Sequence, residues 1–331
     1  GFFGGIGGAS KKGILVKGGN FLEAMTDIDT VIFDKTGTLT KGVFAVTQIN
    51  PVPGVGEADL LHYAALAETH STHPIAISIL RAYSGKIDGN QIEDYKEIPG
   101  LGITVKTREY VILAGNEGLM KSNDIKYRST NALGTIVYIA VDGKYMGNIV
   151  VSDELKKDAK MAVTRLKGLG VKSLVMLTGD SRKVGEKVAE DLGLDGVYAQ
   201  LLPHEKVEKL ESIEKNKTTG GRLVFVGDGI NDAPVLARAD VGIAMGGLGS
   251  DAAIEAADIV LMTDEPHKLA EAIQISRKTK KIVLQNIVLA LSVKGIVLLM
   301  GAMGIATMWE AVFADVGVAL LAVLNSMRAV R

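Results

Sequence analysis

Short apolar runs alternate with stretches of helical periodicity through the second half of the chain. We expect strands at 173–177, 196–199, 223–226, 241–244 and 259–262. An earlier apolar run, Val31 to Phe33, ends abruptly at Asp34 and is expected to be a buried strand of the same sheet. Strands that alternate with helices predict an α/β domain with a doubly wound parallel sheet.

A region of different pattern interrupts this sheet domain after its first strand. We expect strands at 43–49, 102–107, 110–114, 135–141 and 144–151. Pro51 should end the first of them, helices are predicted from Gly56 and after Pro74, and Asp142-Gly143 is a hairpin turn. This α+β insert is placed at 50–147, and its two ends must lie close together because they return to one domain.

The last stretch of the chain is almost free of charge. Lys294 is the only charged residue between Lys281 and Glu310, and Asp315 is the only one between Glu310 and Arg328. About 20 apolar residues are enough to cross a bilayer, so these runs predict a transmembrane hairpin that turns near 307–310. A buried helical pair in a soluble domain is the alternative.

Composition narrows the function classes. The net charge of -1 among 331 residues supplies no basic excess for a nucleic-acid partner. No cysteine is present, which excludes disulfides and thiolate metal sites in this chain. Gly1 is not preceded by a methionine, and no basic segment leads into an apolar core, so no signal peptide is expected. We expect the chain to be a fragment of a longer polypeptide.

The first residues, GFFGGIGGAS, are small and apolar, and Lys11, Lys12 and Lys17 follow them. A glycine-rich apolar helix end followed by lysines fits a membrane exit on the cytoplasmic side. A flexible linker explains the same residues equally well.

Asp34 carries the strongest chemical signal. It is placed at the carboxyl end of a buried strand, where open α/β sheets do their chemistry. Lys35, Thr36 and a glycine-containing turn follow it directly. A carboxylate in this setting can attack a phosphoryl group and form a mixed anhydride, which is a form of covalent catalysis.

Three further segments follow strands and are expected to meet Asp34. Their candidate residues are Thr178, Gly179, Asp180, Lys206, Asp228, Asn231 and Asp232. The Thr-Gly-Asp turn offers a hydroxyl and backbone amides to phosphoryl oxygens, the lysine offers a fixed positive charge, and the carboxylates suit a hard cation such as Mg²⁺. Taken singly, each motif is weak, because a lone Thr-Gly-Asp is most often a turn and a lone helical lysine is usually solvated.

The seven residues from Asp34 to Thr40, DKTGTLT, resemble the phosphorylation signature of the P-type ATPases. Together with the three segments they imply a haloacid-dehalogenase-like phosphoryl-transfer site, with Asp34, Thr36 and Asp228 as Mg²⁺ ligands. Phosphatases of that superfamily usually carry a second aspartate where this chain has Thr36, so the resemblance implies a durable phosphoenzyme. In P-type ATPases an actuator domain supplies the water-activating glutamate in a Thr-Gly-Glu loop, which this chain lacks.

The insert resembles the nucleotide-binding domain of the heavy-metal P-type ATPases. The residues that carry this likeness are Glu68, His73, Pro74, Gly100, Gly102, Gly115 and Asn116. Histidine can stack on a purine or bond to a phosphate, and glycines allow close approach of the backbone to a ligand. The segment DELKKDA resembles the hinge that returns to the sheet domain, where Asp153 is expected to contact the phosphorylation loop.

Lys294 and Asp315 resemble the zinc, cadmium and lead exporting branch of the heavy-metal ATPases. There the aspartate is expected to be a ligand of the transported metal and the lysine a counter-ion, although mutual neutralisation of the pair is an equal alternative. The likeness of ASKKGILVKGG to the segment that joins a transmembrane helix to the phosphorylation strand favours the membrane interpretation of the first residues. The soft-metal cysteine motif of this family is expected upstream of Gly1.

The resemblance therefore predicts the catalytic part of an ATP-driven Zn²⁺, Cd²⁺ or Pb²⁺ exporter. Its domains are expected at 1–20 (helix end and linker), 21–49 and 148–275 (phosphorylation domain), 50–147 (nucleotide-binding domain) and 276–331 (two transmembrane helices). Expected partners are ATP, Mg²⁺, the transported ion, the lipid bilayer, and the actuator domain and upstream helices of the same protein, with catalytic domains in the cytoplasm. A membrane-tethered phosphatase and a non-catalytic nucleotide-binding fragment are the alternatives.

Overall fold

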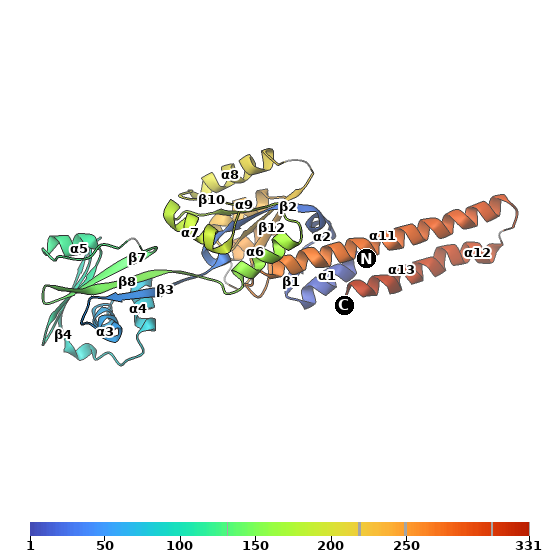
Figure 1. Cartoon of the computed structure of the whole chain (residues 1–331). Helices are drawn as coiled ribbons and strands as arrows, with labels where there is room; N and C mark the ends of the chain where they lie inside the picture. The colour runs from blue at the N-terminus through green and yellow to red at the C-terminus, as the bar shows by residue number, and fades with distance from the viewer. Residues whose placement is uncertain (131, 218–219, 248–249, 306, 331) are drawn as a thin grey trace. The chain divides into compact units, whose positions relative to one another are not determined.

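The computed structural model describes residues 1–130, 132–217, 220–247, 250–305 and 307–330 (Figure 1). The chain forms two compact units. Unit 1 consists of Gly1–Leu39 together with Lys156–Arg331, and unit 2 is Thr40–Leu155. The insert thus divides unit 1 in sequence, as the pattern predicted.

Unit 1 contains a seven-stranded sheet among its described residues. In spatial order its strands are β1 (Ile14–Val16), β13 (Ile259–Leu261), β12 (Val241–Met245), β11 (Arg222–Gly227), β2 (Ile28–Asp34), β9 (Ser173–Leu177) and β10 (Gly196–Tyr198). All neighbours are parallel except β1, which pairs antiparallel with β13. The predicted parallel sheet is confirmed, and it carries one antiparallel edge strand, β1, in the segment that sequence analysis assigned to a helix end and linker.

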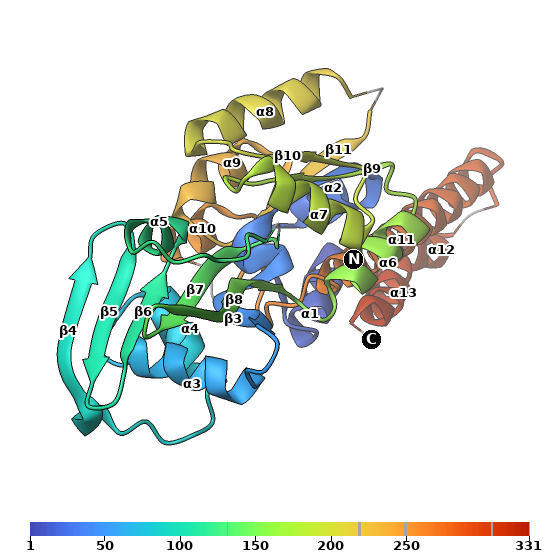
Figure 2. The same ribbon diagram turned by 60° about the vertical axis from the view of Figure 1, so that its left-hand side comes forward.

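Helices cover both faces of this sheet (Figure 2). On one face lie α6 (Ala159–Gly168) and α7 (Arg182–Leu192), and on the other α8 (Pro203–Lys215), α9 (Ala233–Arg238) and α10 (Asp251–Ala256). The second face is closed by apolar contact between helices and strands, for example of Leu210, Phe225 and Leu236. This is the doubly wound α/β architecture that the sequence predicted.

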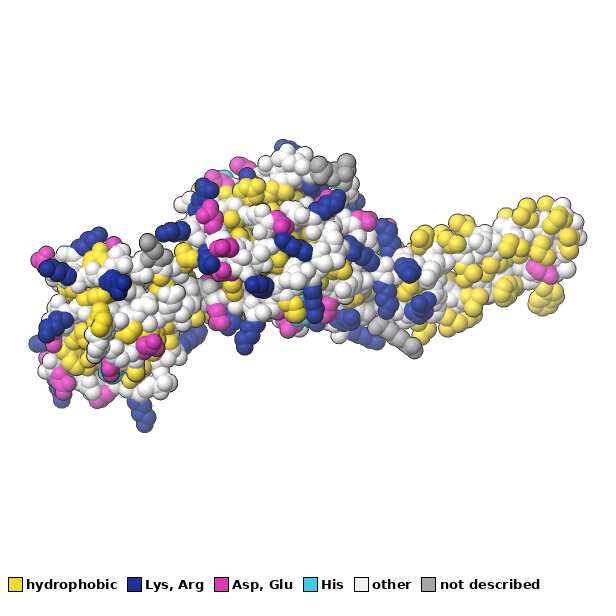
Figure 3. Space-filling model, in the orientation of Figure 1, with side chains coloured by type: hydrophobic (Ala, Val, Ile, Leu, Met, Phe, Trp, Pro, Cys, Tyr) yellow, Lys and Arg dark blue, Asp and Glu magenta, His cyan; other side chains and the backbone are white. Residues whose placement is uncertain are grey.

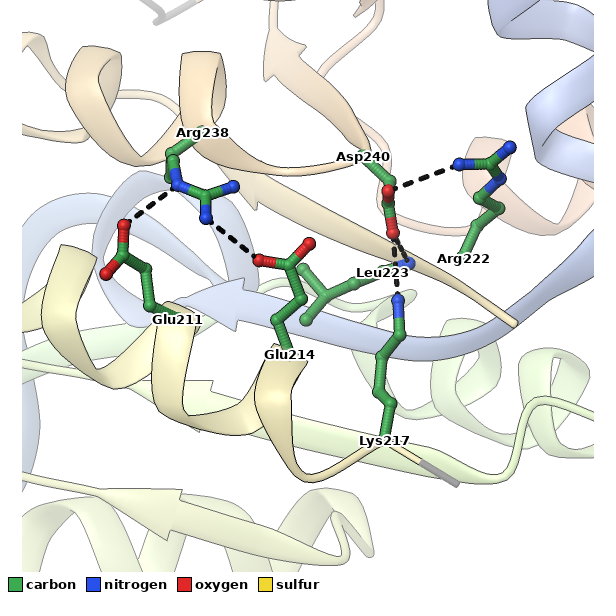
Figure 4. A network of polar contacts seen from close by, with 7 residues as sticks. All are labelled: Glu211, Glu214, Lys217, Arg222, Leu223, Arg238 and Asp240. Carbon is green, nitrogen blue, oxygen red and sulfur yellow. Dashed lines mark hydrogen bonds and ion pairs between the residues drawn. The ribbon is translucent and has the colours of Figure 1, made fainter. Parts of the chain in front are cut away.

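A network of ion pairs fixes the end of α8 to the rest of unit 1 (Figure 4). Arg238 of α9 contacts Glu211 and Glu214 of α8 at 2.9 and 3.2 Å. Asp240 contacts Lys217, just beyond α8, at 2.8 Å and accepts the backbone N–H of Leu223 at 2.8 Å. The opposite end of α8 carries Lys206, so the network helps to hold the helix that positions this side chain.

Over its described residues, unit 2 forms a six-stranded antiparallel sheet with helices on both faces. Its order is β3 (Thr40–Pro51), β8 (Lys144–Leu155), β7 (Thr135–Val141), β6 (Val111–Gly115), β5 (Gly102–Thr107) and β4 (Ile92–Ile98). The helices α3 (Glu57–Ala67) and α4 (Pro74–Ala82) pack on one face, and α5 (Glu117–Ser122) packs on the other around Tyr138. Asp142 and Gly143 form the β7–β8 turn with positive φ, as predicted.

The insert is longer than the 50–147 that sequence analysis gave it. The strands β3 and β8 pair with each other from Thr40 and Leu155 onward, so both belong to unit 2 along their whole length. Pro51 ends β3 as predicted: it is the last residue of the strand and lies opposite Gly147. The strand β4 was not expected, since charged residues mask its pattern.

The remaining helices of unit 1 include the apolar C-terminal pair. They are α1 (Phe2–Lys11), α2 (Gly19–Ala24), α11 (Lys268–Ala302), α12 (Met308–Val312) and α13 (Val318–Ser326). Two helical stretches, Lys268–Ala302 and Met308–Ala329, are long and apolar enough to cross a membrane. Their apolar windows are only 6% and 11% buried, and hydrophobic side chains cover this part of the surface (Figure 3). A buried pair in a soluble core does not fit such exposure.

The hairpin differs from its prediction in two boundaries. The first long helix begins at Lys268, so the expected boundary at 276 falls inside α11. The turn comes earlier than 307–310, because α11 ends at Ala302 and Thr307 already caps α12. Sequence patterns miss both points because helical periodicity continues across the change from cytoplasmic to apolar residues.

Candidate functional site

Asp34 ends the central strand of the sheet in unit 1. Every residue of β2 is buried, and Asp34 itself is 5% exposed. The strand lies between β11 and β9, so the loops that follow these strands emerge at the same edge as Asp34. The topology thus brings together the segments that the sequence placed far apart.

Lys206 is the cation of this site. Its Nζ lies 2.5 Å from Asp34 Oδ1 and 2.8 Å from Asp232 Oδ1. Its side chain is buried in the first turn of α8, which Pro203 begins. One buried ammonium therefore bridges two carboxylates, and each of these contacts is a charge-assisted hydrogen bond.

The pKa values of Asp34 and Asp228 are raised in spite of this cation. Burial, and then the Asp232 carboxylate, raise the pKa of Asp34 to about 7 against the opposing charge of Lys206. Burial and Asp232 also raise the pKa of Asp228 to about 6. For Lys206, burial lowers the pKa, but Asp34 and Asp232 outweigh burial and raise it. The edge carries more negative charge than one lysine can compensate.

A second cation fits this edge. Asp34, Asp228 and Asp232 each offer a carboxylate oxygen, and these oxygens lie within 4.8 Å of one another. Hard cations such as Mg²⁺ prefer such oxygen ligands. Gly37 has a positive φ of 72°, and a Cβ there would collide with the Asp228 carboxylate. Thr36 is exposed, and its expected role as a Mg²⁺ ligand stays a prediction.

The Thr-Gly-Asp turn lies beside the phosphorylation loop. Asp180 forms an ion pair with Lys35 at 2.5 Å. The buried Thr178 hydroxyl accepts the backbone N–H of Asp180 at 3.1 Å, and Gly179 is exposed. Asn231, on the loop after β11, is exposed as well. The catalytic candidates thus gather at one sheet edge, and their individual roles stay predictions.

Unit 2 has a cavity of about 280 Å³ between α4 and the sheet. Six of the seven expected nucleotide-binding residues line it, namely Glu68, His73, Gly100, Gly102, Gly115 and Asn116. Pro74 does not line the cavity; it begins α4, and the His73 ring accepts the backbone N–H of Ile75 at 3.2 Å. The structure therefore gives Pro74 a helix-starting position and not a place in the cavity wall.

Backbone and one buried acid shape this cavity. A Cβ on Gly102 would collide with the Ala114 carbonyl, and Asn116 Nδ2 donates to the Gly100 carbonyl at 2.8 Å. Burial, and to a lesser extent Glu97, raise the pKa of Glu68 to about 7. Glu97 also lines the cavity and was not singled out from the sequence, because an exposed glutamate in a strand gives no signal.

Comparison with known proteins agrees with this geometry. A haloacid dehalogenase-like hydrolase family model matches residues 28–240. The chain is 57% identical over its whole length to a cadmium, zinc and cobalt-transporting ATPase of Bacillus subtilis, covering 47% of that protein. It is 56% identical over 99% of its length to a zinc-transporting ATPase of Synechocystis, covering 45% of that protein. The chain belongs to the haloacid dehalogenase-like hydrolases and, within that larger group, to the P-type ATPases.

A solved structure supports the same family. The crystal structure of a zinc-transporting PIB-type ATPase in the E2.Pi state matches all of this chain with a TM-score of 0.88 at 35% identity, and the chain covers 54% of it. The chain spans about half the length of the curated relatives it matches. The P-type ATPase fold is thus shown for both units and for the C-terminal helices.

The membrane hairpin of this P-type ATPase contains the expected ion pair. Lys294 Nζ lies 3.1 Å from Asp315 Oδ1, and the side chains are 54% and 74% exposed in the protein alone. Earlier in α11, Asn286 donates to Ser326 Oγ at 2.9 Å and accepts from Asn325 at 2.9 Å. Sequence analysis did not predict these contacts, because the sequence does not indicate which polar residues of two apolar helices will face each other.

Two further contacts near the phosphorylation loop are informative. The carboxylate of Asp153 accepts the Thr40 hydroxyl, which confirms that Asp153 contacts the end of the DKTGTLT segment. Lys156 Nζ donates to the Gly37 carbonyl at 2.6 Å, a contact that sequence analysis did not anticipate. The sequence alone does not distinguish Lys156 from the other lysines of its charged segment; its contact with Gly37 is formed only in the folded structure.

Proposed function

We propose that this chain is the catalytic portion of an ATP-driven exporter of divalent metal ions that works through phosphorylation of Asp34. The observation that carries the proposal is the buried Lys206 bridge between Asp34 and Asp232 beside a third carboxylate. A carboxylate held in this way at a sheet edge, with room for a hard cation, suits attack on a phosphoryl group.

The phosphoryl step is a simple displacement. An Asp34 oxygen forms a bond to the γ-phosphorus of ATP, the bond from that phosphorus to the β,γ-bridging oxygen breaks, and ADP leaves. Lys206 and Lys35 provide positive charge near the transferred group. A bound Mg²⁺, held by Asp34 and Asp228, would neutralise phosphate charge. Asp232 lies close enough to add a ligand.

The side chain two residues after Asp34 supports an ATPase over a phosphatase. Thr36 cannot act as the general acid and base that activates water, so the aspartyl phosphate should persist in this chain. We assign the release of phosphate to an actuator domain in the rest of the protein.

Nucleotide binding is assigned to the cavity of unit 2. Its glycines let the backbone approach a ligand, and His73, Glu68 and Asn116 place polar groups on the lining. We take unit 2 as the nucleotide-binding domain and the sheet of unit 1 as the phosphorylation domain, both on the cytoplasmic side of the membrane.

The cargo is proposed from the hairpin. An ionisable pair such as Lys294 and Asp315 in an apolar span is a functional candidate by default. Zinc and cadmium are the proposed ions, because the names of the relatives contain them, and cobalt appears in one of these names. Lead stays a prediction from the resemblance alone.

Radiolabelled ATP tests the phosphorylation. With Mg²⁺, the full-length protein should form an acid-stable adduct that hydroxylamine removes, and Asp34→Asn should lose it entirely. Asp29→Asn, on the same strand but at its other end, is the matched control and should keep the label. Rapid phosphate release with no trapped adduct would favour the phosphatase, and nucleotide binding without labelling would favour the binding fragment.

Transport is tested in the membrane hairpin. Asp315→Ala in the full-length protein should abolish zinc-stimulated ATP hydrolysis and leave nucleotide binding intact. Glu310→Ala, in the first turn of α12 and outside the Lys294–Asp315 pair, is the control. Stimulation by copper(I) in place of zinc would contradict the proposed cargo.

A further inference from the structure

Lys156, the first residue of the segment Lys156-Lys157-Asp158, contacts the phosphorylation loop. Lys156 Nζ donates to the Gly37 carbonyl at 2.6 Å, and its backbone N–H donates to the Leu39 carbonyl at 2.9 Å. The Lys156 charge also acts on the Asp228 carboxylate. The position of Lys156 therefore depends directly on the charge and position of the loop that follows Asp34.

Asp158, two residues later, contacts the start of the long helix α11. It occupies the position before α6, yet its carboxylate makes no capping bond to α6. Its Oδ2 accepts the backbone N–H of His267 at 3.0 Å and lies 2.8 Å from His267 Nδ1. His267 directly precedes α11. The Asp158 carboxylate, which stands at the start of α6, therefore caps the start of α11, where a negative charge interacts favourably with the helix dipole.

This contact is sheltered from solvent. The side chains of His267 and Asp158 are 15% and 19% exposed. Glu271 Oε1 lies 3.8 Å from His267 Nε2, and Lys268 pairs with Glu271 at 3.5 Å. Charge-assisted contacts that are shielded from solvent are stronger than exposed ion pairs. The Asp158–His267 contact can therefore transmit a displacement from α6 to α11.

A second contact ties α6 to α11. Arg277 NH1 donates to the carbonyl of Leu169, just after α6, at 2.8 Å. Ten residues separate His267 from Arg277, which is roughly 15 Å of helix. The two ends of α6 are thus attached at two points of the helix that continues into the membrane hairpin, and a movement of α6 must move α11 with it.

We propose that Asp158 and His267 are positioning residues that couple the chemistry at Asp34 to the membrane helix α11. A phosphoryl group on Asp34 adds negative charge near Lys156, and a shift of Lys156 carries Asp158, and through it His267, along. This inference rests on the proposed function. A simple helix cap would affect stability but not the number of ions moved per ATP.

The test uses the full-length protein in proteoliposomes with zinc. His267→Ala and Asp158→Ala should keep labelling of Asp34 within about twofold of wild type, while zinc moved per ATP hydrolysed falls at least fivefold. His267→Asn places an amide donor near Asp158 and should recover more than half of the wild-type ratio. Lys167→Ala, which removes an α6 ion pair to Asp195 away from α11, is the matched control and should leave the ratio unchanged.

A double-mutant cycle adds a readout that does not depend on perfect folding of one variant. If the two side chains act through each other, the Asp158→Ala/His267→Ala double variant should have the same ratio as either single variant. Additive losses, an unchanged ratio in both alanine variants, or an equal fall in Lys167→Ala would overturn the inference. Absence of label in the wild type would instead refute the proposed function, and the coupling with it.

Discussion

The phosphorylation edge of unit 1 and the cavity of unit 2 each contain a buried acid, yet they are built in opposite ways. At Asp34, charged side chains from four separate segments of the chain hold each other at 2.5 to 2.8 Å. In unit 2, the cavity is shaped by glycine backbone, with Glu68 as its one deeply buried acid among the described lining residues. The first site depends on charge balance and the second on shape.

The difference matches what each site is proposed to hold. A phosphoryl group and a cation are compact charges, so buried opposite charges recognise them strongly. A nucleotide base is a flat, neutral ring that needs close backbone approach and few polar contacts. Substitutions that change charge should therefore harm unit 1 most, and substitutions that add volume should harm unit 2 most.

The largest effect is expected for Lys206→Met. The change keeps the length of the side chain but leaves Asp34 and Asp232 buried without their cation, so phosphorylation of Asp34 should slow by roughly 10²–10³-fold. The rate of labelled adduct formation is the measurement. Lys209→Met is the control on the same helix, where the ammonium lies over the exposed Tyr198 ring at 3.8 Å. If phosphorylation of the Lys206→Met variant slowed by less than tenfold, the claim that the unit 1 site depends on charge balance would be wrong.

A smaller effect is expected for Gly102→Ala in unit 2. The added methyl would collide with the Ala114 carbonyl, so ATP affinity should fall by roughly 30-fold, or about 2 kcal/mol. Gly100→Ala is the matched control, because Gly100 also has positive φ but open space around its Cβ position. Its affinity should change by only about threefold. Titration with ATP in the Asp34→Asn background gives both values, and equal losses would refute the steric argument.

The smallest effect concerns the pH dependence of Glu68. Its raised pKa means that the folded state holds a proton between about pH 4.5 and pH 7 that the unfolded state has lost. The contribution of Glu68 to stability is therefore greatest below pH 4.5 and falls as pH rises to about 7, by on the order of 2 kcal/mol. Glu68→Gln should remove this slope.

Hydrogen exchange of β5 and β6 amides at pH 5 and pH 8, corrected for intrinsic rates, measures the effect. Glu93→Gln, on the exposed β4 and paired with Lys106 at 3.4 Å, is the control and should keep the wild-type slope. If the Glu68→Gln variant keeps the slope as well, another group causes it.

Much of the fold could be predicted from local pattern. The strands β5, β7 and β9 begin and end where their apolar alternation predicted, because each has a buried face or is buried on both. The strands β1 and β4 were missed, since β1 lies in a segment that was assigned to a linker and β4 carries four charges. Short or charged edge strands gain their order from neighbours, which no local pattern contains.

The candidate sites divide in the same way. The DKTGTLT segment and the glycine pairs are recognisable because the backbone there must take up special geometry. Lys156, Asp158, His267 and Asn286 are ordinary polar residues in ordinary segments, and they acquire partners only when distant segments meet. No spacing in the sequence links Asp158 to a residue 109 positions away.

The sequence by itself determined which chemistry Asp34 can perform, the division of the chain by an insert, and the apolar length of the last two helices. These properties depend on residue type and local periodicity. Only the tertiary structure decided that Lys206 bridges Asp34 and Asp232, that the insert begins at Thr40, and that Asp158 caps α11 in place of α6. Each of these depends on which strands and helices become neighbours, and that choice is made by packing of the whole chain.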